Sequence, residues 1–217
     1  LTPGWQPDLH TVGVSTNGTI QEGVDLVAGS TVLISAGTYT APTLITGVYP
    51  SGLYLLGPNA GIDPCTGARV AEAIINTTGV EANDIQSSNV TIDGLKITNA
   101  LNGAVVNAVS SNITVQNCIV DGSSDTGINF WRASSGTIRR NQVLNCAIAG
   151  ISGGDDAGTP GIGDDVPTNA LIEDNCLDND RLAITGYHNG SVIRHNTISN
   201  YSANPVSAGI SGQQLNT

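Results

Sequence analysis

"IRHNTISN", residues 193–200, sets a pattern on which much of the sequence can be aligned. An apolar residue comes first, asparagine occupies the fourth and eighth places, and a second apolar residue occupies the sixth. The stretches "IEDNCLDN" (172–179) and "IRRNQVLN" (138–145) repeat all four features, while "VQNCIVDG" (115–122) and "IDGLKITN" (92–99) keep the apolar frame. Five copies in one register indicate a repeat protein.

The spacing of the copies is nearly constant, because the interval from Ile92 to Val115 equals that from Val115 to Ile138. Repeats of this length are typical of solenoids. Their apolar runs are short, rich in β-branched residues and separated by Asn and Gly, which favours strands over α-hairpins. We expect at least two strands in each coil, the second of which lies at 127–130, 150–153, 183–186 and 209–212. Strands of stacked coils would pair in parallel about 4.8 Å apart.

Stacking of the coils would place Asn141, Asn175 and Asn196 in one column at a turn. Asparagine tolerates left-handed backbone geometry, and its side chain can bond to the next coil. We therefore predict an asparagine ladder with left-handed geometry at these residues.

The outward second and third places of the repeat carry opposite charges on neighbouring coils. Such pairs fix the register of a sheet, and this explains them better than a catalytic role for His195. The expected columns are Arg139, Glu173 and Arg194, and beside them Arg140, Asp174 and His195.

The composition excludes several functions. The net charge is −11 and Lys96 is the single lysine, so the chain lacks the clustered cations that bind nucleic acid. No apolar run is long enough to span a membrane. The chain starts at Leu1 and contains no methionine, which favours an exported, extracellular or cell-surface protein. The spacing of its cysteines predicts no pairing: Cys65, Cys118, Cys146 and Cys176.

The stretch "TIQEGVDLVAGSTVLISAGTY" (19–39) has the features of a helical cap before a first strand. Thr19 and Glu22 have capping-box spacing, and apolar residues follow at helical intervals. With the repeats, the chain resembles the right-handed parallel β-helices of the pectate-lyase-like superfamily. The resemblance implies an all-β, single-stranded right-handed parallel β-helix with a short N-terminal capping helix over 19–217, preceded by an extended arm, 1–18.

Candidate site residues follow the second strand of successive coils. Aromatic rings offer flat faces to sugars, and an acid and an imidazole can exchange protons with a substrate. The alternative is that these side chains only cover the strand ends. We call this group the strand-end rim; its predicted sugar-binding residues are Trp131, Arg132, Tyr187 and His188, and its catalytic candidates are Asp155, Asp156, His188 and Arg132.

One long insertion, "GGDDAGTPGIGDDVP" (153–167), interrupts the repeat, and the sequence offers no other sizeable loop. Its carboxylates are the hard oxygen ligands that calcium accepts, although a solvated acidic loop explains them better. The predicted calcium ligands are Asp155, Asp156, Asp164 and Asp165.

Two functions stay open. The first is an extracellular structural and binding module that binds carbohydrate and associates head to tail into a filament, through the arm 1–18 or through an end that exposes Ile198 and Ile210. The second is a polysaccharide lyase or hydrolase acting at the strand-end rim. The motifs of the similar polygalacturonases are only partly present: Asp155 and Asp156 are paired, but Asn129 lacks a following Thr-Asp. The short chain and single loop favour the module.

Overall fold

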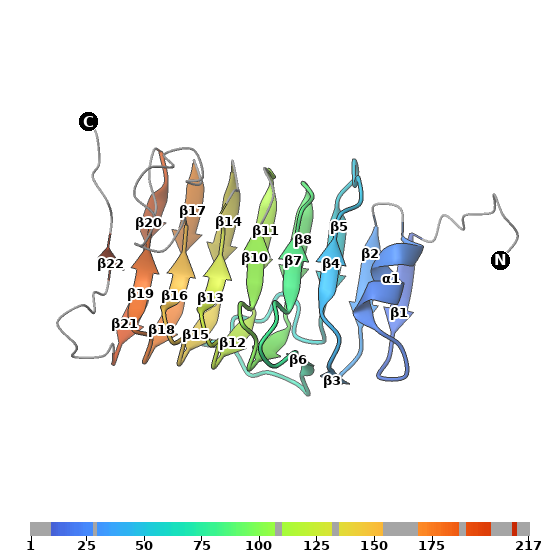
Figure 1. Ribbon diagram of the computed structural model, residues 1–217, viewed down its shortest axis with the longest axis horizontal. Helices are drawn as coiled ribbons and strands as arrows, with labels where there is room; N and C mark the ends of the chain where they lie inside the picture. The colour runs from blue at the N-terminus through green and yellow to red at the C-terminus, as the bar shows by residue number, and fades with distance from the viewer. Residues whose placement is uncertain are drawn as a thin grey trace, which may run out of the picture.

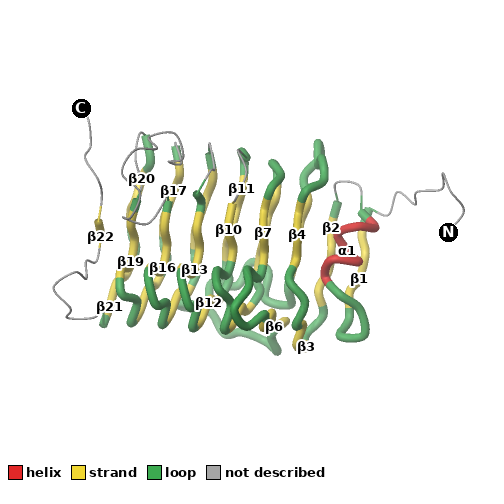
Figure 2. The backbone as a smooth tube through the Cα atoms, viewed as in Figure 1, coloured by secondary structure: helices red, strands yellow, loops and turns green. Residues whose placement is uncertain are grey.

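The computed structural model describes residues 10–27, 30–106, 110–131, 135–153, 169–186 and 190–200, and the backbone of 210–211. Its strands form three parallel sheets that wrap around one elongated core, with a short helix at the N-terminal end (Figures 1 and 2). From β2 onward, each coil contributes one strand to each sheet in turn. No helix among the described residues is long and apolar enough to span a lipid bilayer.

The three sheets are here called A, B and C. Sheet A contains β1 (Thr11–Val14), β2 (Thr31–Ile34), β5 (Leu53–Leu56), β8 (Val90–Asp93), β11 (Ile113–Gln116), β14 (Gly136–Arg139), β17 (Ala170–Glu173) and β20 (Val192–Arg194). Sheet B contains β3 (Gly37–Tyr39), β6 (Ala73–Asn76), β9 (Lys96–Thr98), β12 (Ile119–Asp121), β15 (Gln142–Leu144), β18 (Cys176–Asp178) and β21 (Thr197–Ser199). Sheet C contains β4 (Thr43–Ile45), β7 (Asn83–Ile85), β10 (Ala104–Val106), β13 (Thr126–Asn129), β16 (Ala149–Ser152), β19 (Leu182–Thr185) and β22 (Ile210–Ser211).

The predicted register of the repeat is confirmed, since Val115 pairs with Ile138, Ile138 with Ile172, and Ile172 with Ile193. The eight-residue unit itself spans two strands, one in sheet A and one in sheet B, and the strand predicted after it belongs to sheet C. Each coil therefore has three strands, one more than the minimum that the sequence indicated.

Apolar side chains of equivalent residues stack inside the solenoid. Val115, Ile138 and Ile172 of sheet A are 0% exposed, and Val143 of sheet B is also 0% exposed. The inward residues of the last coil differ, because Ile193 and Ile198 are only partly buried.

Left-handed residues turn the chain between sheets. The residue before the asparagine column has a positive φ in each coil: 52° at Asn117, 51° at Arg140, 57° at Asp174 and 55° at His195. The prediction that Asn141, Asn175 and Asn196 adopt this geometry is therefore wrong. A buried amide needs its side chain directed inward, so the corner is formed by the preceding residue.

The asparagine ladder itself is confirmed. The Asn175 Oδ1 accepts the backbone N–H of Asn141 at 2.9 Å and its side-chain amide at 3.0 Å. The Asn175 Nδ2 donates to the Ile138 carbonyl at 3.0 Å, while the Asn175 N–H donates to the Asn196 Oδ1 at 3.0 Å. Asn141 and Asn175 are 0% and 1% exposed. Each amide thus satisfies backbone groups that the corner would otherwise leave buried without partners.

Replacing Asn175 by alanine should lower the free energy of unfolding by roughly 1 to 3 kcal/mol, because the bonds it makes to Asn141 and Ile138 are lost inside the solenoid. Chemical denaturation would measure this. Gln142→Ala, which removes a half-buried outward amide at the start of β15, beside the ladder residue Asn141, is the control and should cost under about 0.5 kcal/mol. Equal losses for the two variants would contradict the ladder's role.

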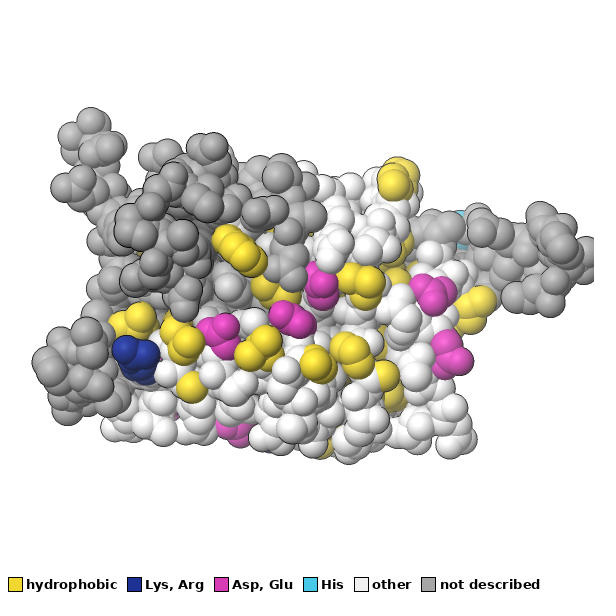
Figure 3. All heavy atoms as spheres, viewed as in Figure 1, with side chains coloured by type: hydrophobic (Ala, Val, Ile, Leu, Met, Phe, Trp, Pro, Cys, Tyr) yellow, Lys and Arg dark blue, Asp and Glu magenta, His cyan; other side chains and the backbone are white. Residues whose placement is uncertain are grey.

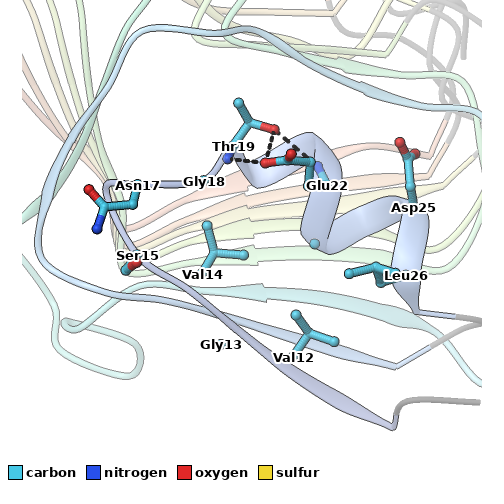
Figure 4. A pocket seen from close by; sticks show the side chains of 11 residues that line it. Val12, Gly13, Val14, Ser15, Asn17, Gly18, Thr19, Glu22, Asp25 and Leu26 are labelled. Atoms are coloured by element: carbon cyan, nitrogen blue, oxygen red, sulfur yellow. Dashed lines mark hydrogen bonds between the residues drawn. The ribbon is translucent and has the colours of Figure 1, made fainter. Parts of the chain in front are cut away.

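The predicted cap is confirmed as α1 (Ile20–Leu26), closed by a capping box between Thr19 and Glu22 (Figure 4). The Glu22 carboxylate accepts the Thr19 N–H at 2.7 Å, and the Thr19 hydroxyl accepts the Glu22 N–H at 3.2 Å. These bonds lower the pKa of Glu22. Ile20 and Val24 are buried against the first coil.

The strand before α1 is part of the solenoid, whereas the sequence analysis expected residues 1–18 to form an extended arm outside it. Thr11–Val14 form β1, which pairs in parallel with β2 of the same chain. Residues 1–9 lie outside the described residues.

A second long loop, missed by the sequence analysis, joins β5 to β6. Residues 57–72, here called the strap, run along the corner between sheets A and B. The Gly61 N–H donates to Asp93 at 3.0 Å, and Arg69 donates to the Asn117 carbonyl at 2.8 Å. A Cβ on Gly94 would overlap the strap backbone, so the corner beneath it requires glycine.

A disulfide from Cys65 to Cys176 fastens the strap, and it links residues 111 positions apart. Arg69 anchors the loop from within through an ion pair with Glu72 at 2.6 Å. Cys118 and Cys146 are buried free thiols. The strap therefore joins the coil of β5 to coils further along the solenoid.

Opening this disulfide should lower the free energy of unfolding by about 2 to 5 kcal/mol, because it closes a long loop in the unfolded chain. Denaturation of the Cys65→Ser/Cys176→Ser variant, compared with the wild type with and without reductant, measures the effect. The variant should not respond to reductant. An unchanged wild-type stability, when mass spectrometry shows both thiols free, would contradict the prediction.

Candidate functional site

Three neighbouring strands of sheet C, which the residues of the strand-end rim follow in the sequence, end together. Ile128 pairs with Ile151 and Ile151 with Ile184, as the sequence predicted. The next residues, Asn129, Ser152 and Thr185, also pair in register. The segments that follow these strands therefore leave the sheet along one edge.

Trp131 is the rim residue that the structure describes. It follows the buried Phe130 and is partly buried itself. The Phe130 N–H donates to the Ser152 carbonyl at 2.9 Å, so the ladder continues one residue past β13. This pairing fixes the backbone just before Trp131.

The other predicted rim residues lie outside the described residues, so the structure does not test their assembly. These are Arg132, Asp155, Asp156, Tyr187 and His188, and the same is true of the further calcium candidates Asp164 and Asp165. In the sequence, Arg132, Asp155, Asp156, Tyr187 and His188 each come two to four residues after a strand whose end is in register with its neighbours.

A polar row that the sequence analysis did not single out lies beside the rim. Asn129, Ser152 and Thr185 occupy equivalent outward positions in sheet C. The Asn129 Oδ1 is buried and has no hydrogen-bond partner among the described residues. Such an amide oxygen can accept a donor from a ligand. The signal was available, because each residue directly follows one of the aligned isoleucines.

The charge on this side of the molecule is mainly acidic. Figure 3 shows acidic side chains at several points along the visible face and basic ones only toward its C-terminal end. Within the described ranges, no three His, Cys, Asp or Glu side chains are grouped so that they could hold a metal ion. A polyanion at this face would need a cationic group to offset the repulsion.

Two open hollows of the described structure lie elsewhere. One of about 580 Å³ lies between β1 and α1 and is lined by Val12, Val14 and Leu26 among others (Figure 4). Another of about 400 Å³ lies beside the strap and includes Leu33, Leu56 and Val70. Of the two carboxylates that line the first hollow, Glu22 is engaged in the capping box and Asp25 accepts the Gln21 amide. The second hollow is mainly apolar. Neither offers an acid and a base together.

A buried carboxyl lies under the start of sheet C. Asp180 is 1% exposed, and its Oδ1 accepts the Cys146 N–H at 2.8 Å. Its Oδ2 has no partner among the described residues and lies against Gly150, where a Cβ would collide with it. Burial raises the pKa of Asp180 to about 7 and also raises the pKa of the Cys146 thiol.

The contribution of Asp180 to the stability of the protein should therefore fall as the pH rises from about 4 to about 7. Over that range native Asp180 keeps a proton that the unfolded chain, with its pKa near 3.8, has released, so raising the pH favours unfolding. Asp180→Asn should raise the melting temperature more at pH 8 than at pH 4, with an upper limit on the order of 4 kcal/mol. Ser123→Ala is the uncharged control, because Ser123 is buried at the position equivalent to Asp180 two coils earlier. If the melting temperatures of Asp180→Asn and the wild type differ by the same amount at pH 4 and pH 8, the prediction is wrong.

Comparison with known proteins gives the family. The model described as "Right handed beta helix region" matches residues 51–214. The chain belongs to this family. Among curated proteins, none matches the sequence.

A solved structure shows how far this β-helix resembles an enzyme. The crystal structure of an alginate lyase from Paenibacillus sp. str. FPU-7 superposes with a TM-score of 0.71 and 15% sequence identity, covering 93% of this chain and 80% of that chain. At this identity the likeness concerns the fold.

Proposed function

We propose that this β-helix protein is an exported polysaccharide lyase that cleaves acidic polymers at the strand-end rim. The observation that carries the proposal is the register of β13, β16 and β19, whose strands end together in sheet C. Three chain segments that contain an aromatic residue, an arginine, carboxylates and a histidine thus start from one rigid edge. The alginate lyase with the same fold supports this function over a purely structural one.

Cleavage by β-elimination requires a base, an acid that protonates the leaving oxygen, and a group that neutralises the uronate carboxylate. A base removes the proton beside the uronate carboxylate, the bond to the leaving sugar oxygen breaks, and a carbon–carbon double bond forms without water. The carboxylate must be neutralised so that the carbon can lose its proton.

The rim residues can be assigned to these tasks. The indole of Trp131 would hold a sugar face, and the guanidinium of Arg132 would neutralise the carboxylate. Imidazole exchanges protons near neutral pH, so His188 is the base, and the phenol of Tyr187 lies one residue away to protonate the leaving oxygen. The outward amide of Asn129 adds a polar contact beside Trp131.

Calcium is the cofactor that the acidic insertion would accept. Carboxylates of Asp155, Asp156, Asp164 and Asp165 are suitable oxygen ligands, and a bound cation would reduce the repulsion between an acidic protein and an acidic polymer.

A hydrolase and a structural module are supported less well. Inverting hydrolysis needs two carboxylates on opposite sides of the bond, and the residue two after Asn129 is Trp131, where the similar hydrolases have aspartate. Self-association through the solenoid ends stays a prediction. The disulfide agrees with export into an oxidising compartment.

The test is product formation from alginate and polygalacturonate, followed by the ultraviolet absorbance of the unsaturated product. His188→Asn should lower kcat roughly a hundredfold or more, because general acid–base catalysis is lost. Trp131→Ala should raise KM about tenfold through the loss of sugar stacking. If calcium takes part, a chelator removes activity and added calcium restores it.

His195→Asn is the matched control, since it removes an exposed histidine from the corner between sheets A and B and keeps a residue that tolerates the left-handed backbone there. It should keep activity within about twofold of the wild type. Full activity in His188→Asn, or no unsaturated product from any acidic polymer, would contradict the proposal.

A further inference from the structure

The outward face of sheet A carries a second arrangement of polar groups, away from the strand-end rim. Tyr54 pairs with Thr91, Thr91 with Thr114, and Thr114 with Thr137, so these four residues form one column. Arg139 is the outward residue two positions after Thr137 and lies in the adjacent column. We call these five residues the sheet A strip.

Arg139 is held in place by a chain of hydrogen bonds. Its Nε donates to the Gln116 Oε1 at 2.7 Å, and the Gln116 Nε2 donates to the Asp93 Oδ2 at 2.7 Å. The other oxygen of Asp93 accepts the Asn117 amide at 2.8 Å and the Gly61 N–H of the strap at 3.0 Å. Asp93 is only 7% exposed, so the base of this chain is fixed. The guanidinium is thus oriented before any ligand arrives.

The terminal nitrogens of Arg139 remain available. In the described structure its one side-chain hydrogen bond uses Nε, which leaves Nη1 and Nη2 as donors. The predicted pairing of Arg139 with Glu173 does not form, because the Glu173 Oε2 accepts Arg194 at 2.6 and 2.8 Å. Arg140 on the same coil is exposed. Two arginines without an ion-pair partner among the described residues therefore stand together in a chain of net charge −11.

The column beside Arg139 suits a sugar chain. No hydrogen bond within the described residues uses the hydroxyls of Thr91, Thr114 and Thr137, which are partly exposed. Tyr54 is 42% exposed at the other end of the column. Three strand spacings of about 4.8 Å separate Tyr54 from Thr137, so the strip is about 14 Å long.

We propose that the sheet A strip is a second, non-catalytic binding site for a carboxylated polysaccharide. The polymer lies along the solenoid axis, a sugar ring packs on Tyr54, hydroxyls bond to the threonine column, and a uronate carboxylate receives two parallel N–H donors from Arg139. Guanidinium and carboxylate match in shape, which favours uronate over a neutral sugar. The class of polymer rests on the proposed function, whereas the site itself does not involve the rim.

Calorimetric titration with alginate, polygalacturonate and a neutral glucan tests the strip in a His188→Asn background, so that cleavage does not interfere. Arg139→Gln should weaken binding of the carboxylated polymers about tenfold to a hundredfold, the effect of losing a charge-assisted pair. Arg139→Lys should also bind these polymers more weakly than the wild type, because lysine keeps the charge but lacks the forked donors. Each variant is expected to melt at the wild-type temperature.

Arg181→Gln is the matched control, because it removes one exposed arginine from the corner between sheets B and C and should change affinity less than about twofold. If Arg139→Gln and Arg181→Gln weaken polymer binding equally, the effect comes from overall charge and the proposed site at the sheet A strip is wrong. A comparison with Trp131→Ala separates the two proposals. If only Trp131→Ala loses binding, the polymer binds at the strand-end rim and the proposal for the sheet A strip is wrong. If only Arg139→Gln loses binding, the proposal for the strip is supported even if no cleavage is found.

Discussion

Backbone hydrogen bonding between equivalent residues of successive coils is the interaction on which the rest of this structure depends. A strand of three or four residues has no stability alone, and here each interior strand is paired on both sides. The pairing aligns Ile138 with Ile172, and both side chains are completely buried. A slip of one residue would turn these columns outward, so the apolar interior and the backbone ladder enforce the same register.

The corners show where sequence reasoning succeeds and where it fails. The eight-residue pattern predicted the alignment of Asn141, Asn175 and Asn196, because residues at equal places in a repeat must stack. It assigned the left-handed backbone to the wrong residue, because asparagine is also favoured there and Arg140, which occupies the corner, has no such preference. Only the inward direction of the amide, which follows from the completed coil, decides between neighbouring positions.

The strap could not be predicted for a different reason. It interrupts the repeat with residues that have no counterpart in other coils, and its contacts are distant in sequence. Cys176 stands at a strand position that Gln142 fills in the preceding coil, so its pairing with Cys65 leaves no periodic signal. The hydrogen bonding of Arg139 to Gln116 instead of Glu173 likewise depends on which neighbour Arg194 engages. For the rim, the sequence predicted that the strand ends are aligned. The neighbouring polar row of Asn129, Ser152 and Thr185 was recognised only from the pairing of the strands in the structure.

The strap changes how this solenoid is expected to unfold. In a repeat protein each coil contacts only its neighbours, so unfolding can begin at one end and advance coil by coil. A covalent link from Cys65 to Cys176, with intermediate contacts at Asp93 and Asn117, ties non-adjacent coils to one another. The coils from β5 to β18 then form one cooperative block that opens as a whole. The coil of β20 and β21 lies beyond the link and is left to fray alone, so amide exchange should divide the protein sharply after β18.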